Sequence, residues 1–309
     1  MRIIFMGTPD FSVGTLEALI GAGHEVVLCV TQPDKPKGRG KEVQSSPVKQ
    51  AALAHEIPVL QPKKIREESV IQELKTYQAD VIVVVAFGQI LTKEILCMPN
   101  YGCINVHASL LPKYRGAAPI QWAVMNGEKV TGVTTMRMDE GVDTGDRILS
   151  REVPLAKEET GGSLFEKLMK VGAELCVETL QLLEENKAQF QPQDHTKATK
   201  TVLIKKELGQ IQWQNSAETI ERLIRGLNPW PSAYTTINGK TLKLWKATSV
   251  SGENCMPPGT IAEVGSDSFT VATGEGKLEV QEVQLEGKKR MSTKEFLRGH
   301  SIIVGMELK

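Results

Sequence analysis

Short apolar runs alternate with helical patterns over the first half of the chain. Four of these runs are rich in Val, Ile and Phe and apolar on both faces, which is typical of buried parallel strands. They cover residues 2–6, 25–31, 80–87 and 101–107. Helical spacing between them predicts helices near residues 11–23, 47–55 and 65–77. Strands that alternate with helices predict an α/β fold with a doubly wound, mostly parallel, Rossmann-like sheet.

The pattern changes in the last third of the chain. An amphipathic stretch over 161–186 predicts the last helix of the α/β domain, and the basic segment 189–206 has no periodicity, as in a linker. A helix predicted over 216–226 precedes short alternating strands with a hairpin signal at Asn238-Gly239. We predict an α/β domain over 1–188, a basic linker over 189–206, and a small OB-like β-barrel over 207–309.

Composition restricts the function only slightly. The 309 residues exceed what one core comfortably holds, and the formal net charge of zero gives no case for a polyanionic partner. The 5 cysteines are scattered without a CxxC pair, so we expect reduced thiols, a cytoplasmic protein and no metal site. No apolar stretch has the length of a membrane span.

Several isolated residues are assigned to the fold rather than to chemistry. Three tryptophans, Trp213, Trp230 and Trp245, are expected to fill the core of the barrel. Three histidines have no predicted partner and are expected on the surface or as caps: His24, His55 and His195.

The fourth apolar run ends on two polar side chains, Asn105 and His107. Side chains alternate along an extended chain, so these two point to one face while Ile104 and Val106 point to the other. A lone Asn or His at a strand end often only caps a neighbouring backbone group. However, ligands of open parallel sheets bind outside the carboxyl ends of the strands. An amide donor and a proton-exchanging imidazole at that edge are candidate catalytic groups.

The loop that follows strengthens this interpretation. Leu110 and Leu111 stand beside Pro112, Arg115 and Gly116, and we expect both leucines to be exposed. Exposed leucines in a rigid loop suit a flat aromatic ligand better than they suit solvent.

A second polar element is the glycine-rich turn MDEGVDTGD over residues 138–146. Its aspartates, Asp139, Asp143 and Asp146, fit a solvated acidic turn, a calcium loop, or a site in which one of them pairs with His107. The spacing and terminal glutamate of an EF-hand are missing. A carboxylate beside an imidazole fixes its orientation and raises its pKa, so the paired arrangement is the functional hypothesis.

The two elements together resemble the formyltransferases that use 10-formyltetrahydrofolate. The segments NVHASLLPKYRGAAPIQWA and MDEGVDTGD match the Asn-x-His pair, the SLLP-type loop and the Asp of a G-x-D-T-G turn in that family. The resemblance implies 10-formyltetrahydrofolate as the formyl-donating co-substrate, no metal, and a catalytic triad of Asn105, His107 and Asp143. It also implies folate contacts from Ser109, Leu110, Leu111 and Pro112, and from Val85, Ala86 and Phe87.

Similarity to the family extends over essentially the whole chain and implies the acceptor. The segments MGTPDFSVGTLEAL, TQPDKPKGRGKEVQSSPVK and LIRGLNPWPSAYTTINGKTLKLWKA are similar to members that formylate methionyl-tRNA. The implied acceptor is the α-amino group of methionine on initiator methionyl-tRNA, and the implied protein is a monomer that needs no membrane. The turn GTPD lacks G-x-G-x-x-G, so a nicotinamide cofactor is excluded.

Two basic segments are candidates for binding the tRNA. Charge runs of this kind are most often solvated loops, but near the ligand edge of the sheet they suit phosphates and groove edges. The resemblance implies that Arg39 recognises the weak first base pair of the initiator. The predicted tRNA-binding residues are Lys35, Lys37, Arg39, Lys41, Lys205 and Lys206.

The residues fit direct transfer through a tetrahedral intermediate, with Asn105 as donor to the oxyanion. His107 acts either as a second donor or as the base for the amine proton, and the sequence does not choose between them. Two other functions stay open. One is a related folate-dependent formyltransferase or formyl-folate hydrolase with another acceptor. The other is an inactive tRNA-binding module.

Overall fold

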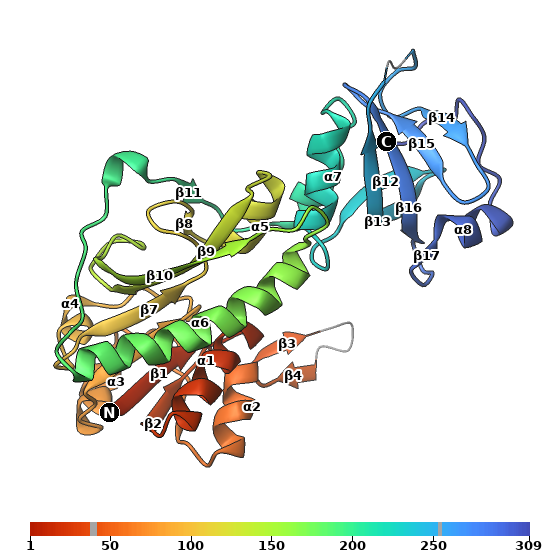
Figure 1. Cartoon of the computed structure of the whole chain (residues 1–309). Helices are drawn as coiled ribbons and strands as arrows, with labels where there is room; N and C mark the ends of the chain where they lie inside the picture. The colour runs from red at the N-terminus through yellow and green to blue at the C-terminus, as the bar shows by residue number, and fades with distance from the viewer. Residues whose placement is uncertain (38–41, 253–254) are drawn as a thin grey trace. The chain divides into compact units, whose positions relative to one another are not determined.

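The computed structural model describes residues 1–37, 42–252 and 255–309, which form two compact units (Figure 1). The first unit consists of Met1–Pro119, Val130–Pro154 and Phe165–Thr201. The second consists of Ile120–Lys129, Leu155–Leu164 and Val202–Lys309. Most of the basic segment predicted as a linker therefore lies in the first unit. The second unit includes most of helix α5 (Pro119–Met125).

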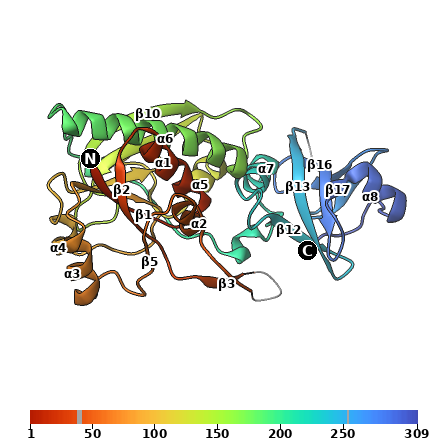
Figure 2. The ribbon, with the colours of Figure 1, turned by 90° about the horizontal axis from the view of Figure 1, so that it is seen from below.

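The first unit is built on a seven-stranded sheet in the order β10-β9-β7-β6-β1-β2-β5 (Figures 1 and 2). The strands from β7 to β5 run parallel, as the apolar runs predicted. Strand β9 pairs antiparallel with both β7 and β10, and a turn joins β9 to β10. The strands are β1 (Arg2–Gly7), β2 (Glu25–Val30), β5 (Val59–Leu60), β6 (Val81–Val85), β7 (Cys103–His107), β9 (Val130–Arg137) and β10 (Arg147–Pro154).

Helices cover both faces of this sheet. Leu74 of α3 shares a buried cluster with Ile4 and Cys103, whereas Gly172 of α6 lies against Val106 on the other face. Cys103 and Val106 therefore point to opposite faces, and Asn105 and His107 alternate with Val106 as predicted. The helices of this unit are α1 (Asp10–Gly21), α2 (Pro47–Ala54), α3 (Glu68–Thr76), α4 (Lys93–Leu96) and most of α6 (Gly161–Glu184). A two-stranded ribbon of β3 (Lys35–Lys37) and β4 (Glu42–Gln44) lies outside the main sheet.

The second unit contains an antiparallel sheet in the order β12-β13-β16-β15-β14, with β17 on β16. The predicted hairpin at Asn238-Gly239 joins β12 to β13, and both residues have positive φ, 48° and 76°. Its strands are β12 (Ala233–Ile237), β13 (Lys240–Val250), β14 (Ile261–Val264), β15 (Phe269–Ala272), β16 (Lys277–Leu285) and β17 (Met291–Ser292). The helices are α7 (Ala217–Gly226) and α8 (Thr293–Gly299).

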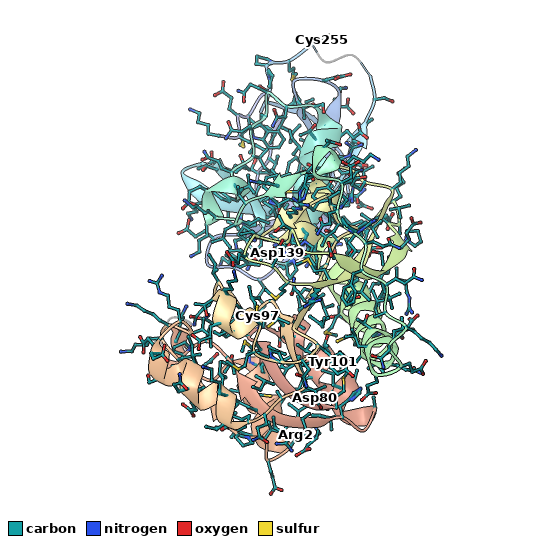
Figure 3. All side chains as sticks on the ribbon, turned by 90° about the vertical axis from the view of Figure 1, so that its left-hand side faces the viewer. Arg2, Asp80, Cys97, Tyr101, Asp139 and Cys255 are labelled. Atoms are coloured by element: carbon teal, nitrogen blue, oxygen red, sulfur yellow. The ribbon has the colours of Figure 1, made fainter. Side chains whose placement is uncertain are left out.

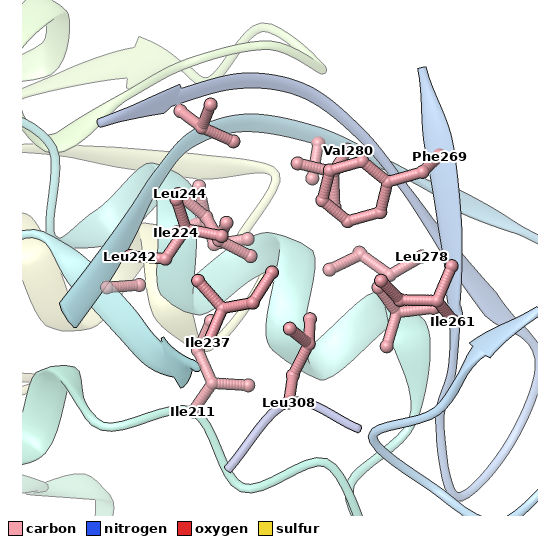
Figure 4. Close-up of a cluster of buried hydrophobic side chains, with 14 of the residues drawn as sticks. Ile211, Ile224, Ile237, Leu242, Leu244, Ile261, Phe269, Leu278, Val280 and Leu308 are labelled. Carbon is pink, nitrogen blue, oxygen red and sulfur yellow. The ribbon is translucent and has the colours of Figure 1, made fainter. Parts of the chain in front are cut away.

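Residues 305–309 close this sheet into a barrel, as predicted. Leu308 N–H donates to the Gly259 carbonyl at 2.8 Å, beside β14, and Lys309 exchanges two hydrogen bonds with Thr236 of β12. The barrel encloses a core of mostly aliphatic side chains that also includes Phe269 and Ile224 of α7 (Figure 4). One short segment thus hydrogen-bonds to β12 and to the start of β14, and Ile211 N–H adds a bond to the Tyr234 carbonyl of β12.

The three tryptophans differ in burial. Trp213 is 4% exposed and donates to Thr235 Oγ1 at 3.1 Å, as expected for a core residue. Trp230 is 55% exposed, so the prediction that it fills the core is wrong. It lies in the turn between α7 and β12. Trp245 is half-buried under the guanidinium of Arg290, 4.7 Å from its ring centre.

In the described part of the chain, no helix combines the length and the apolar character that a bilayer crossing requires.

Candidate active site

Asn105 and His107 occupy the carboxyl end of β7, where the sheet presents them together. They are 8% and 7% exposed, so each keeps only a small accessible surface. Strand β9 pairs alongside, with Thr134 opposite His107. Pairing with β9 keeps the end of β7 in the sheet, so the side chains of Asn105 and His107 are mostly shielded from solvent.

The turn between β9 and β10 delivers a carboxylate to the same place. Asp139 (labelled in Figure 3) caps the turn by accepting from Gly141 N and Thr144 Oγ1, at 3.0 and 2.6 Å. A side chain at Gly145 would place its Cβ 1.8 Å from the Arg137 carbonyl oxygen, so only glycine fits there. Asp143 has a left-handed backbone, with φ of 53°. Of the three predicted candidates, Asp143 is the one that faces His107.

The carboxylate of Asp143 is the centre of the polar cluster. Its Oδ2 accepts from the Gly116 backbone N–H at 2.7 Å and lies 3.6 Å from His107 Nδ1. Its Oδ1 lies 3.4 Å from Asn105 Nδ2. Amide, imidazole and carboxylate from segments 38 residues apart therefore meet within side-chain contact.

A second contact of His107 indicates where its proton is. Nε2 lies 2.9 Å from the Tyr114 carbonyl oxygen, which can only accept a hydrogen bond. The proton of a neutral ring therefore belongs on Nε2. Nδ1 is then the nitrogen that faces Asp143, and it is the atom able to exchange a proton with a bound molecule.

The loop 109–112 is fixed by hydrogen bonds from several directions. Ser109 is buried and its hydroxyl donates to the Lys113 carbonyl at 2.6 Å. Leu111 N–H donates to Thr134 Oγ1 at 3.1 Å, and the peptide bond to Pro112 is cis. The prediction that both leucines are exposed is wrong for Leu111, which is 2% exposed because these bonds draw its backbone against β9. Leu110 keeps part of its surface accessible.

The segment at the end of β6 presents its backbone rather than its larger side chains. Val85 and Phe87 are buried, and only Ala86 is exposed, with φ of 47°. Ser12 Oγ donates to the Val85 carbonyl at 2.6 Å, and Gln32 Nε2 donates to the Phe87 carbonyl at 3.1 Å. The folate contact predicted for this segment stays a prediction, and of its three side chains only that of Ala86 is exposed.

Sequence reasoning missed the contribution of residues 190–201. This segment forms β11 (Lys200–Thr201), which pairs in parallel with β8 (Arg115–Gly116) of the loop after His107. A Cβ on Gly116 would lie 2.6 Å from the Thr201 carbonyl oxygen, so the close pairing requires glycine. Gln193 is buried among these groups. His195, predicted to have no partner, has its Nδ1 3.2 Å from Arg115 Nη1. A polar stretch without periodicity carried no signal of these contacts.

Comparisons with known proteins show the family of this chain. The formyl transferase family matches residues 1–180, and the formyl transferase C-terminal domain matches residues 203–301. The methionyl-tRNA formyltransferase of Agathobacter rectalis is 64% identical over 97% of this chain and 96% of its own length. That of Lachnospira eligens is 56% identical over 100% of this chain and 99% of its own.

The chain belongs to the methionyl-tRNA formyltransferase family.

Solved structures agree at the level of the fold. The sugar 3N-formyl transferase WlaRD superposes with a TM-score of 0.65 at 20% identity, over 94% of this chain and 99% of its own. An N-formyltransferase from Helicobacter canadensis gives 0.64 at 19% identity, over 91% of this chain and 99% of its own.

The predicted tRNA-binding residues are scattered over both units. Lys35 is exposed in β3 of the first unit, and Lys205 and Lys206 are exposed in the second. Arg39 and Lys41 lie outside the described residues, and the Lys37 side chain is likewise not described. Among the residues that are described, no three His, Cys, Asp or Glu side chains gather as metal ligands would.

Proposed function

We propose that this chain transfers the formyl group of 10-formyltetrahydrofolate to the α-amino group of methionine on initiator methionyl-tRNA. The observation that carries the proposal is the meeting of Asn105, His107 and Asp143 at the sheet edge of a chain from this family. Folate compounds in neighbouring structures support the donor. WlaRD was crystallised in the presence of 5-N-formyl-THF, and the Helicobacter canadensis enzyme in complex with folinic acid.

The reaction needs one bond made and one broken at the formyl carbon. The neutral amine attacks this carbon, the carbonyl electron pair moves to oxygen, and a tetrahedral oxyanion forms. The oxyanion then collapses, the carbon–nitrogen bond to the folate breaks, and the leaving nitrogen takes up a proton while the amine loses one. A free α-amino group has a pKa near ~7.7–8, so much of it is already nucleophilic at neutral pH.

Asn105 and His107 have different roles at the oxyanion. Asn105 Nδ2 is a neutral donor whose geometry is set by Asp143 Oδ1. His107 Nδ1 faces the same point, and a proton there can be donated to the oxyanion or received from the amine. Asp143 stabilises the positive charge that the imidazole gains when Nδ1 accepts the amine proton, and the charge that a protonated ring already carries when Nδ1 donates to the oxyanion. The folate would lie along the accessible surface of Leu110 and around Ala86, beside the polar cluster.

A transfer assay tests the proposal directly. The full chain is given 10-formyltetrahydrofolate labelled in the formyl group, with charged initiator or elongator methionyl-tRNA. We expect label on the initiator and much slower labelling of the elongator. Release of labelled formate at the same rate without tRNA would instead identify a hydrolase. No transfer and no release, with tRNA binding retained, would identify an inactive tRNA-binding module.

The tRNA contacts proposed for Lys205 and Lys206 have a matched control in the same chain. Lys63 and Lys64 are also adjacent, exposed lysines. Replacing both members of the first pair by alanine should raise the KM for tRNA and reduce the salt slope of binding, by about 0.7–0.9 per lost phosphate contact. The control pair should change neither quantity. Equal effects of the two pairs would reject a specific contact.

Arg39 stays a prediction for the recognition of the initiator. Arg39→Ala should lower the ratio of initiator to elongator formylation, with the rate on the initiator falling more than that on the elongator. An unchanged ratio would remove Arg39 from this role.

A further inference from the structure

Gln193 joins the two segments that frame the proposed catalytic triad. Its side chain is 5% exposed, and its Nε2 donates to the backbone carbonyls of Asp143 at 3.0 Å and Gly145 at 2.7 Å. Its Oε1 accepts from Arg115 Nε at 3.1 Å and Nη2 at 2.7 Å. One buried amide therefore links the turn that carries Asp143 to the loop that follows His107.

The orientation of this amide follows from its partners. Arg115 has only donors and the two carbonyls have only acceptor atoms, so oxygen must face Arg115 and nitrogen must face the turn. Both amide protons and both oxygen lone pairs are then used. A side chain that makes four such hydrogen bonds while buried is well suited to fixing the spacing of its partners.

The turn needs such a constraint because Asp143 adopts an uncommon backbone conformation. A left-handed residue other than glycine costs roughly 1–3 kcal/mol and persists only where its surroundings hold it. Gln193 binds the carbonyl of Asp143 itself, and therefore acts on the peptide that sets the direction of its carboxylate. On the other side, Arg115 precedes Gly116, whose N–H donates to that carboxylate.

We propose that Gln193 is a positioning residue that, together with Arg115, aims the Asp143 carboxylate at His107. This inference rests on the proposed catalytic role of Asp143. Gln193 belongs to the segment that leads out of the first unit, and the adjoining β11 is paired with β8. A displacement of this segment would therefore move the turn and the loop together. A misplacement of about 1 Å at a reacting group lowers a rate by about 100-fold.

The test is a double-mutant cycle on the full chain with saturating co-substrates. Gln193→Met keeps the approximate volume and removes all four hydrogen bonds. We expect its kcat to fall about 10- to 100-fold, with both KM values within about threefold of the parent chain. Gln191→Met is the matched control, because Gln191 is exposed two positions away, and its kcat should stay near the parent value. Should Gln193→Met not fold, Gln193→Glu keeps the acceptor for Arg115 while losing both donors, and the same fall is expected.

The cycle separates positioning from general support of the fold. In an Asp143→Asn chain, the further change Gln193→Met should lower kcat by less than about twofold, because the carboxylate it aims is already gone. An equal factor in both backgrounds, or a kcat near the parent value for Gln193→Met alone, overturns the inference and leaves the proposed function standing. A normal kcat for Asp143→Asn alone overturns the proposed role of Asp143, and the inference with it.

Discussion

Removing the charge of Asp143 should slow formyl transfer far more than it disturbs the fold. Asp143→Asn keeps the size of the side chain and an oxygen that can accept from Gly116 N–H, so the turn retains its main contact. What is lost is a negative charge 3.6 Å from His107 Nδ1. The side chains of His107 and Asp143 are 8% and 15% exposed, so water screens this pair only in part.

The magnitude follows from that separation. Two unit charges at this distance interact by about 4–5 kcal/mol at an effective dielectric constant of about 20. With His107 as the base for the amine proton, the imidazole gains its charge along the reaction path, so most of this energy stabilises the transition state rather than the bound substrate. Each ~1.36 kcal/mol corresponds to about tenfold in rate, so we expect kcat to fall by about 10³-fold with little change in either KM.

Steady-state formylation of initiator methionyl-tRNA, with each substrate varied in turn while the other is saturating, measures kcat and the two KM values. Asp139→Asn is the control, since this carboxylate lies in the same turn, and asparagine can make the same cap to Gly141 and Thr144. A folded Asp143→Asn chain with kcat within about threefold of the parent would refute the electrostatic argument. An equal loss in Asp139→Asn would show that the turn, rather than the charge, matters.

Three further outcomes are expected. Asn105→Ala should lower kcat by about 10²–10³-fold through loss of the oxyanion donor, measured in the same assay, and a normal kcat would contradict it. Gly145→Ala should lower the midpoint of thermal unfolding, because its Cβ would lie 1.8 Å from a carbonyl oxygen, whereas Gly21→Ala has open space and should not. A thiol reagent at mildly alkaline pH should label only the exposed Cys97 and Cys255 (Figure 3) of the folded chain, with full labelling after denaturation. The other three thiols are those of Cys29, Cys103 and Cys176, and burial raises the pKa of each to about 12. Fast labelling of any of these three would contradict their burial.

Alternation along a single strand was enough to predict which side chains of β7 share a face. The chemistry of the acidic turn suggested that one of its aspartates pairs with His107, but only the family resemblance selected Asp143 among the three. In contrast, the burial of Leu111 depends on Thr134, a neighbour supplied by an antiparallel strand that pairs across the sheet. Local exposure arguments fail where a loop finds hydrogen-bonding partners on another element.

Gln193 illustrates a stronger limit on what the sequence predicts about burial. It stands in a polar stretch with no hydrophobic period, where composition indicates solvent exposure, yet its side chain is buried. Its partners are Arg115 and two backbone carbonyls. Because every residue has a backbone carbonyl, no pattern of residue types in the sequence identifies the two that Gln193 binds. Trp230 shows the opposite case, in which a large apolar side chain lies exposed because the turn that carries it does not enter the core.

The closure of the barrel by residues 305–309 makes the carboxyl-terminal end unusually sensitive to trimming. Loss of these few residues would leave the backbone groups of Thr236 in β12 and of Ile261 at the start of β14 without their partners at the same time. Unpaired strand edges recruit strands of other chains, so the shortened protein should aggregate on storage even where its first unit stays folded.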